Sequence, residues 1–116
     1  MKPDLTIQAW TQSMSLRLKR HAAIAGNIAN ADTPGYRPKQ VAFEDSLQRA
    51  YESRSVDRLG KVEAQTITID DGTPRPDGNS VNMDRQMANM AENTLLYNAT
   101  AEFLARKFRM VKSVIQ

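Results

Sequence analysis

The residues that most often perform catalysis in proteins are scarce in this chain. His21 is the only histidine, there is no cysteine, and no Asp or Glu lies three or four positions from His21. A general base or an activated nucleophile needs a partner within hydrogen-bond reach, so we predict a packing or interface role for His21. The adjacent carboxylates Glu44-Asp45 and Asp70-Asp71 could in principle act as acid and base, but such pairs are more typical of solvated turns. We therefore expect neither an enzyme nor a bound cofactor.

One short acidic motif could bind a metal ion. Asp77-Gly78-Asn79 matches part of a calcium-binding loop. Such a loop needs oxygen ligands at alternate positions and a bidentate Glu at its twelfth position. Counted from Asp77, the twelfth position is Ala88, so we predict no metal site.

Basic residues form two groups, one toward each end of the chain. Such groups could contact phosphates or anionic lipid, although a solvated helix face is the more common interpretation. The formal net charge is only +3 over 116 residues, which does not demand a nucleic-acid partner. A small basic helical nucleic-acid-binding module stays open as the alternative function. The groups are Arg17, Lys19 and Arg20, and Arg106, Lys107, Arg109 and Lys112.

The segment 27–36 carries the sharpest local pattern. Asn30 can end a helix, Pro34 prevents its continuation, and Gly35 permits a positive φ. The pattern predicts a defined exit of the chain from a helix, and it leaves open whether the turn is also an interaction epitope. The residues of this signature turn are Asn27, Asn30, Thr33, Pro34, Gly35 and Tyr36.

The C-terminal segment 82–116 contains neither Gly nor Pro, which predicts one long helix. A seam with a period near 3.5 residues runs along it and is typical of packing against another helix. Further apolar residues widen the stripe and indicate more than one neighbour. The seam consists of Met83, Met87, Met90, Thr94, Tyr97, Ala101, Leu104, Phe108, Val111 and Ile115, and the widening residues are Leu95, Leu96, Phe103, Met110 and Val114.

The N-terminal segment 1–31 has a weaker version of the same seam. Asp4 suits a helix start, and Pro34 forbids continuation of the helix. At about 1.5 Å per residue the two terminal helices have similar lengths, so they could lie side by side. The weaker seam consists of Ile7, Thr11, Met14, Leu18, His21, Ala25 and Ile28.

The middle segment 32–81 is predicted to be mostly irregular. A short helix around 43–51 and an extended piece within 62–69 are compatible with its pattern, and 70–80 is dense in turn-forming residues. The predicted fold is mainly all-α: an N-terminal core helix (1–31) and a C-terminal core helix (82–116) pack as an antiparallel, coiled-coil-like hairpin. Both ends together form one structural domain. No stretch is apolar and long enough to span a membrane.

The string NIANADTPGY, residues 27–36, closely resembles the N-terminal signature of flagellar basal-body rod and hook proteins. Residues 75–108 are similar to the end of the proximal rod member of that family. Many other rod members carry Tyr-Gln-Ala-Asn where this chain has YNAT at 97–100, which favours the proximal member. The two matched stretches cover 44 of the 116 residues, and residues 48–74 contribute none.

The resemblance implies a non-enzymatic axial subunit of the rod. Such a subunit is exported by the flagellar type III system without a cleaved signal peptide, and it assembles on the periplasmic side of the inner membrane. The implied partners are other copies of itself, the next rod protein FlgC, the adaptor FliE and the export gate or MS ring. The rod encloses the export channel and transmits torque, and neither nucleic acid nor a membrane span is part of this expectation.

Two seamed helices bury little surface in isolation, so the sequence also predicts how the subunit assembles. Helices without tertiary partners are only marginally stable, and neighbouring subunits would supply the missing apolar faces. We therefore expect the ends of a free monomer to be partly unfolded and to order on assembly. The predicted packing and assembly residues are Ile7, Met14, Leu18, Ile28, Met87, Met90, Tyr97, Leu104, Phe108 and Val111.

Overall fold

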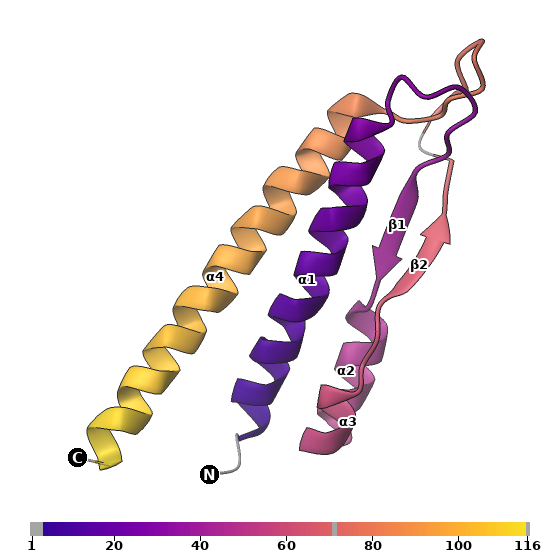
Figure 1. Cartoon of the computed structure of the whole chain (residues 1–116). Coiled ribbons are helices and arrows are strands. Elements are labelled where there is room, and N and C mark those ends of the chain that lie inside the picture. Colours follow the sequence, from indigo (N-terminus) through magenta and orange to yellow (C-terminus); the bar gives the residue numbers. More distant parts are fainter. Residues whose placement is uncertain (1–3, 71, 116) are drawn as a thin grey trace.

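The computed structural model describes residues 4–70 and 72–115, which form an elongated body measuring 63 × 24 × 16 Å. Two long helices run antiparallel, and a small module packs along the other side of the first of them (Figure 1). The mainly helical hairpin predicted from the sequence is thereby confirmed. In chain order the elements are α1 (Leu5–Ala29), β1 (Lys39–Ala42), α2 (Glu44–Glu52), α3 (Val56–Gly60), β2 (Gln65–Thr68) and α4 (Met83–Ile115).

The helix α1 has a capping group at each end. Asp4 is the N-cap, and its carboxylate accepts a hydrogen bond from the backbone N–H of Ile7 at 2.7 Å. At the other end Asn30 donates from its backbone and from its side chain to the carbonyl of Gly26. These caps fix both ends of α1. The C-cap, Asn30, lies four residues before Pro34, which the helix cannot include.

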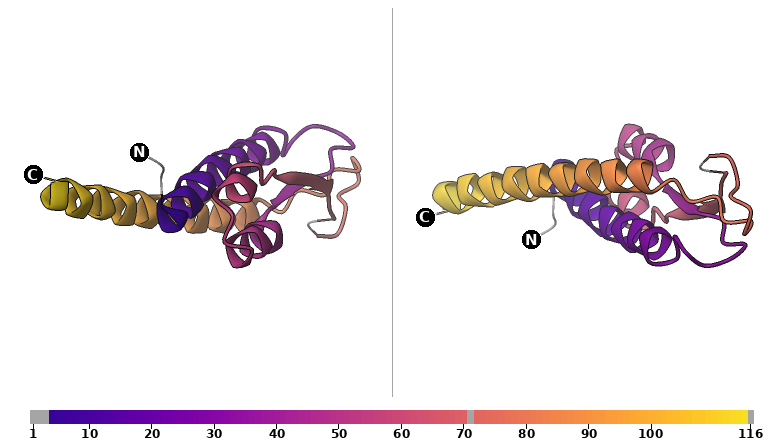
Figure 2. Two further views of the ribbon diagram at one scale, coloured as in Figure 1. Left: turned by 90° about the horizontal axis from the view of Figure 1, so that it is seen from below. Right: turned by 90° about the horizontal axis from the view of Figure 1, so that it is seen from above.

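The helix α4 contains 33 residues and makes its main packing contacts with α1 alone. Side-chain contacts define the antiparallel register: Asn27 of α1 meets Gln86, Trp10 meets Phe103, and Asp4 meets Lys107. Because Asp4 caps the start of α1, residues 108–115 extend about 12 Å past it. We call these residues the C-terminal overhang, and Figure 2 shows α4 projecting beyond the start of α1.

The middle segment forms a β-α-α-β module against α1. The strands β1 and β2 pair antiparallel, with Lys39 opposite Thr68 and Ala42 opposite Gln65. The core of the module consists of Leu16 from α1 with Val41 and Phe43. This arrangement buries one face of β1 and orients α2 and α3 on the same side of α1.

A single arginine ties α1 to this module. Arg20 donates two hydrogen bonds to the carbonyl of Val41, pairs with the carboxylate of Glu44, and lies over the ring of Phe43 at 4.3 Å. The short helix predicted around 43–51 is present as α2, and the extended piece predicted within 62–69 is present as β2. The sequence analysis did not predict β1 or α3.

Candidate functional site

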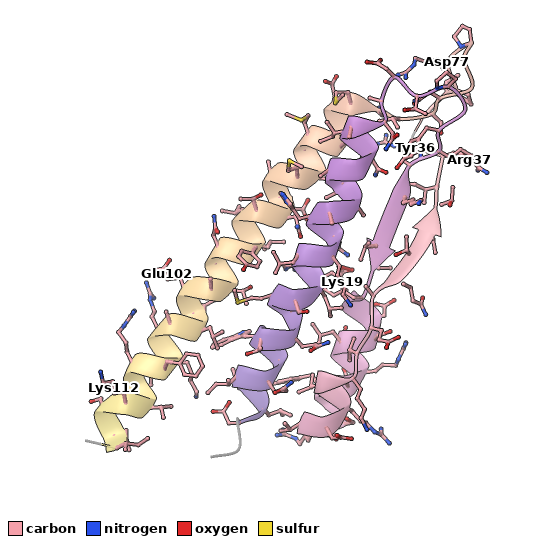
Figure 3. The ribbon with its side chains drawn as sticks, viewed as in Figure 1. Lys19, Tyr36, Arg37, Asp77, Glu102 and Lys112 are labelled. Atoms are coloured by element: carbon pink, nitrogen blue, oxygen red, sulfur yellow. The ribbon has the colours of Figure 1, made fainter. Side chains whose placement is uncertain are left out.

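The loops at one end of the hairpin are joined by a set of hydrogen-bonded polar side chains, half of them buried, which we call the polar clasp. It connects the end of α1 with the loop that leads into α4, two segments that lie far apart in the sequence. Figure 3 shows Tyr36 and Asp77 at this end of the molecule, with Glu102 and Lys112 toward the opposite end. The polar clasp consists of Asn27, Asn30, Tyr36, Arg75, Asn79 and Gln86.

Asn27 is the centre of the polar clasp. Its side chain is almost fully buried, and its amide nitrogen donates to the carbonyl of Lys39 at 2.8 Å and to the side-chain oxygen of Gln86 at 3.0 Å. Its amide oxygen accepts from the backbone N–H of Lys39 at 2.9 Å and from the hydroxyl of Tyr36 at 3.0 Å. One side chain thus links α1, the chain exit, β1 and α4, and its polar atoms are all satisfied.

Asn79 links the loop that leads into α4 to the end of α1. Its amide nitrogen donates to the carbonyls of Asn30 and Thr33 at 2.8 and 2.7 Å, and its oxygen accepts from the N–H of Val81. Arg75 adds a hydrogen bond from its guanidinium to the carbonyl of Ala31. Because these carbonyls follow the last turn of α1, the loop caps the end of that helix from outside.

Two glycines allow the loops to approach this closely. Gly35 and Gly78 both have positive φ, +73° and +82°, a region that other residues rarely adopt. The N–H of Gly35 donates to the carbonyl of Asp77 at 2.9 Å. A Cβ on Gly78 would lie 3.4 Å from the Cα of Gly35. The glycine of the signature turn therefore serves backbone contact within the chain.

The six residues of the predicted signature turn are brought together, but they divide into two sets. Asn27, Asn30 and Tyr36 direct their polar groups into the polar clasp. Thr33, Pro34 and Gly35 form an exposed tip, where the hydroxyl of Thr33 donates to Asn30. The turn is thus a structural feature of the fold, and an epitope role for its tip stays a prediction.

The ten predicted packing residues also divide by exposure. Leu18, Met87 and Phe108 each leave about half of the side chain exposed, and their assembly role stays a prediction. The other seven are buried or half-buried, namely Ile7, Met14, Ile28, Met90, Tyr97, Leu104 and Val111.

Polar residues occupy part of the seam between α4 and α1. The apolar spacing of the sequence predicts Met87 and Thr94 at these positions instead. Gln86 and Asn93 are buried, whereas Met87 and Thr94, one position further along, are exposed. Asn93 donates to the carbonyl of Arg17 at 2.9 Å and accepts from its guanidinium at 3.3 Å. A count of apolar residues does not reveal this polar part of the seam. The spacing does indicate it, because Gln86 and Asn93 are one heptad apart and lie on the same face of α4 as Met90.

The residues considered for catalysis do not converge. His21 is exposed on α1, so its predicted packing role does not apply within the chain. Glu44 pairs with Arg20, and Asp70 pairs with Arg37 at 2.9 Å, while Asp71 lies outside the described residues. Within 4–70 and 72–115 no three His, Cys, Asp or Glu side chains are grouped to hold a metal ion.

The charged groups at the far end of the hairpin stabilise it electrostatically. The N–H of Ile7 and then the ammonium of Lys107 lower the pKa of Asp4 below its ordinary value of 3.8. Arg106 pairs with Glu102 one turn away on α4. The basic groups that motivated a nucleic-acid-binding alternative are therefore in large part engaged within the chain.

The C-terminal overhang is the part of the structure that looks incomplete on its own. Phe108, Met110, Val114 and Ile115 are between 52% and 86% exposed. Upstream on α4, Leu95 and Phe103 are exposed by 69% and 50%. Single exposed apolar residues are normal, but four of them within eight consecutive residues of one helix form an exposed strip that indicates a surface for another protein.

Comparison with known proteins gives the class to which this arrangement belongs. Residues 11–37 match the family model for flagella basal body rod proteins. This match covers α1 from Thr11 onward and the signature turn. The part of the chain that builds one side of the polar clasp is therefore the part that the family model recognises.

Curated relatives extend the similarity over nearly the whole chain. Flagellar basal body rod protein FlgB of Yersinia ruckeri is 31% identical over 132 residues, covering 99% of this chain and 96% of the relative. FlgB of Escherichia coli (strain K12) is 32% identical with the same coverage, and FlgB of Bacillus subtilis (strain 168) is 30% identical over 95% of this chain and 92% of the relative. The chain belongs to the flagellar basal body rod protein family.

Within that family its similarity is to FlgB, from enterobacteria as well as from Bacillus. It is a structural subunit of the flagellar rod, and it assembles with other flagellar components in the basal body. Among the described residues, no helix combines the length and the apolar character that crossing a membrane requires.

Proposed function

We propose that this subunit forms the proximal part of the rod and assembles by helix packing between subunits around the export channel. The observation that carries the proposal is the C-terminal overhang, a helical segment with apolar side chains and no partner element alongside it in the described structure. An exposed helix of this kind gains stability when a neighbour buries its apolar face. The role is structural, with no enzymatic activity.

The proposed neighbours are other copies of the chain, a FlgC-like rod protein, the adaptor FliE and the export gate or MS ring. The proposed place is the rod on the periplasmic side of the inner membrane, reached through the flagellar type III system without cleavage of a signal peptide. The similarity to FlgB over almost the entire chain supports this assignment. The exposed strip on α4 supplies the surface that such contacts need.

A heterologous contact repeated with a rise along an axis produces an open helical stack instead of a closed ring. The overhang of one subunit is suited to such a contact because it is displaced along the long axis of the molecule, beyond the start of α1 (Figure 2). We propose that the overhang completes its packing only at the growing tip of the rod, which limits aggregation before export.

The test is Phe108→Asp, which places a carboxylate in the exposed strip without touching α1. We expect the purified variant to fold as the native chain does, while swimming and incorporation into isolated basal bodies are abolished and export of the subunit continues. Ser113→Asp is the matched control, since it adds the same charge to an exposed position of the overhang that carries no apolar side chain. Normal motility of Phe108→Asp cells would contradict the proposal.

A further inference from the structure

A groove runs along one face of α1 beside the β-α-α-β module, and α4 lines its larger part. It consists of two adjoining hollows of about 600 and 290 Å³, and Arg17 and Glu44 line both of them. Along α1 the lining extends from Ala9 to Ile24, which corresponds to about 22 Å of helix. We call this feature the central groove; its length matches four turns of a helix.

The larger hollow of the central groove has a surplus of positive charge. Four basic side chains line it, against the two carboxylates of Glu44 and Glu92. Glu44 is already paired with Arg20. Neither Arg17 nor Lys39 forms an ion pair with any residue in the described ranges. The four basic residues are Arg17, Arg20, Lys39 and Arg85.

Arg17 is incompletely hydrogen-bonded within the chain. Its Nε is buried and has no hydrogen-bond partner, and its one side-chain hydrogen bond, to Asn93, is long at 3.3 Å. Burial and then the neighbouring charge of Arg20 lower the pKa of Arg17, which means that its charged form is disfavoured where it stands. A carboxylate entering the groove would pair with the accessible part of this guanidinium and offset its charge.

The smaller hollow has a different character. Its lining includes Trp10 from α1 and Leu47 and Tyr51 from α2, with Tyr51 45% exposed. Trp10 also stacks against Phe103 of α4, with ring centroids 5.9 Å apart. An apolar hollow that continues into a cationic one fits a helix that carries apolar side chains at one end and acidic side chains at the other.

We propose that the central groove binds an amphipathic helix of a neighbouring rod subunit, with the carboxylates of that helix over Arg17 and Lys39 and its apolar side chains over Trp10 and Tyr51. This inference rests on the proposed function, because it needs an adjacent subunit. It identifies a second contact surface, separate from the C-terminal overhang and selective for acidic partners. Charge complementarity gives such a contact its register and specificity.

The direct test is a carbodiimide reaction on isolated basal bodies, which joins an amine and a carboxylate only when they touch. We expect mass spectrometry to identify an amide between Lys39 and an Asp or Glu of a neighbouring subunit. Lys39→Arg is the matched control, because it keeps the charge but removes the reactive amine, and the cross-link must disappear. An amide formed only within the chain, or no amide at all, would overturn the proposal.

The second test separates a contact role of Arg17 from an internal one. Arg17→Met keeps the straight stem that packs beside Phe43 but removes the charge. We expect the purified chain to fold with a midpoint of urea denaturation lowered only by the loss of the long hydrogen bond to Asn93, and incorporation into basal bodies to be reduced about tenfold or more. Lys19→Met removes a charge from an exposed position outside the groove and is expected to leave both readouts unchanged.

The outcomes distinguish the two proposals. A chain absent from isolated basal bodies would contradict the rod assignment itself. A chain that is present, with no cross-link at Lys39 and normal incorporation of Arg17→Met, would contradict the groove inference alone. A purified Arg17→Met chain that fails to fold would assign the residue to the fold and overturn the proposal. An isolated chain that binds inorganic phosphate while its rods lack the cross-link would indicate a small-anion site and would overturn the proposal as well.

Discussion

The two ends of the hairpin are built on opposite principles. At the loop end, Asn27 and Asn79 are buried and their side chains are fully hydrogen-bonded within the chain. At the C-terminal overhang, Met110 and Val114 are 64% and 86% exposed and pack against no other element. The subunit therefore fixes its own shape at one end with polar contacts, and it leaves apolar surface at the other end for assembly.

This difference has a physical basis in what each interaction requires. Hydrogen bonds are directional, and a buried donor or acceptor that loses its partner destabilises the fold by about 1–3 kcal/mol, so a polar network specifies one geometry. Apolar burial is non-directional and grows with area, so it suits contacts that form only when a neighbour arrives. Substitutions at the two ends should separate folding from assembly.

The largest effect on stability is expected for Asn27→Leu. The change removes four hydrogen bonds and leaves buried groups of Gln86, Tyr36 and Lys39 without their partner. We expect the free energy of unfolding, measured by urea denaturation, to fall by about 3 kcal/mol or more. Asn98→Leu makes the same change at an exposed position of α4 and should alter it by no more than about 0.5 kcal/mol. Equal midpoints for the two variants would refute the importance of the polar clasp.

A smaller effect is expected where the loops of the polar clasp touch. Gly78→Ala forces a side chain into a backbone with φ of +82° and should lower the free energy of unfolding by about 1–2 kcal/mol. Gly26→Ala lies within α1, where an added Cβ meets no atom within 4 Å, and should raise it by up to about 1 kcal/mol. Thermal denaturation of the two purified variants checks that their free energies of unfolding change in opposite directions. A change in the same direction would contradict the role assigned to Gly78.

Next in size is Asp4→Ala at the start of α1, which should cost about 1 kcal/mol near neutral pH by removing the N-cap. Because the native pKa of Asp4 lies below its ordinary value of 3.8, the stabilisation is fully present above that value. It is lost as the pH falls through the lowered native value. Urea titrations at neutral and at strongly acidic pH should therefore show the two proteins converge in acid. A difference that persisted there would exclude the carboxylate as its source.

The smallest effect on the monomer is expected from the double change Met110→Ser and Val114→Ser in the overhang. Both side chains are already largely exposed, so the free energy of unfolding should stay within about 0.5 kcal/mol of the native value. Ile7→Ser, at a buried position of α1, is the contrasting variant and should destabilise by about 2 kcal/mol or more. A large loss of monomer stability in the double variant would show that the overhang already packs in the free chain.

Much of the fold could be predicted because its signals are local. The absence of Gly and Pro from 82–116 predicts a helix, and α4 occupies Met83–Ile115. The signature turn could be predicted because Pro34 and Gly35 restrict the backbone wherever they occur. The strand β1 could not, because its partner β2 follows two intervening helices and the four residues of β1 have no alternating pattern of their own.

The candidate site could be predicted only in part, for a related reason. Local spacing identifies Asn27 and Asn30 as turn residues, but their partners Gln86 and Asn79 lie more than forty positions away in the sequence. An apolar count also treats Gln86 and Asn93 as solvent-facing, although hydrogen bonds across the hairpin make them buried. A polar seam depends on partners that local spacing does not reveal.

The β-α-α-β module leans on α1 and makes no substantial contact with α4. A change in the turn between α2 and α3, around Ser53 and Arg54, is therefore not transmitted to the pair of long helices or to the overhang. That turn is a suitable position for a fluorescent label or an epitope tag. A labelled subunit of this kind would let the growth of the rod be followed while α1 and α4 keep their native sequence.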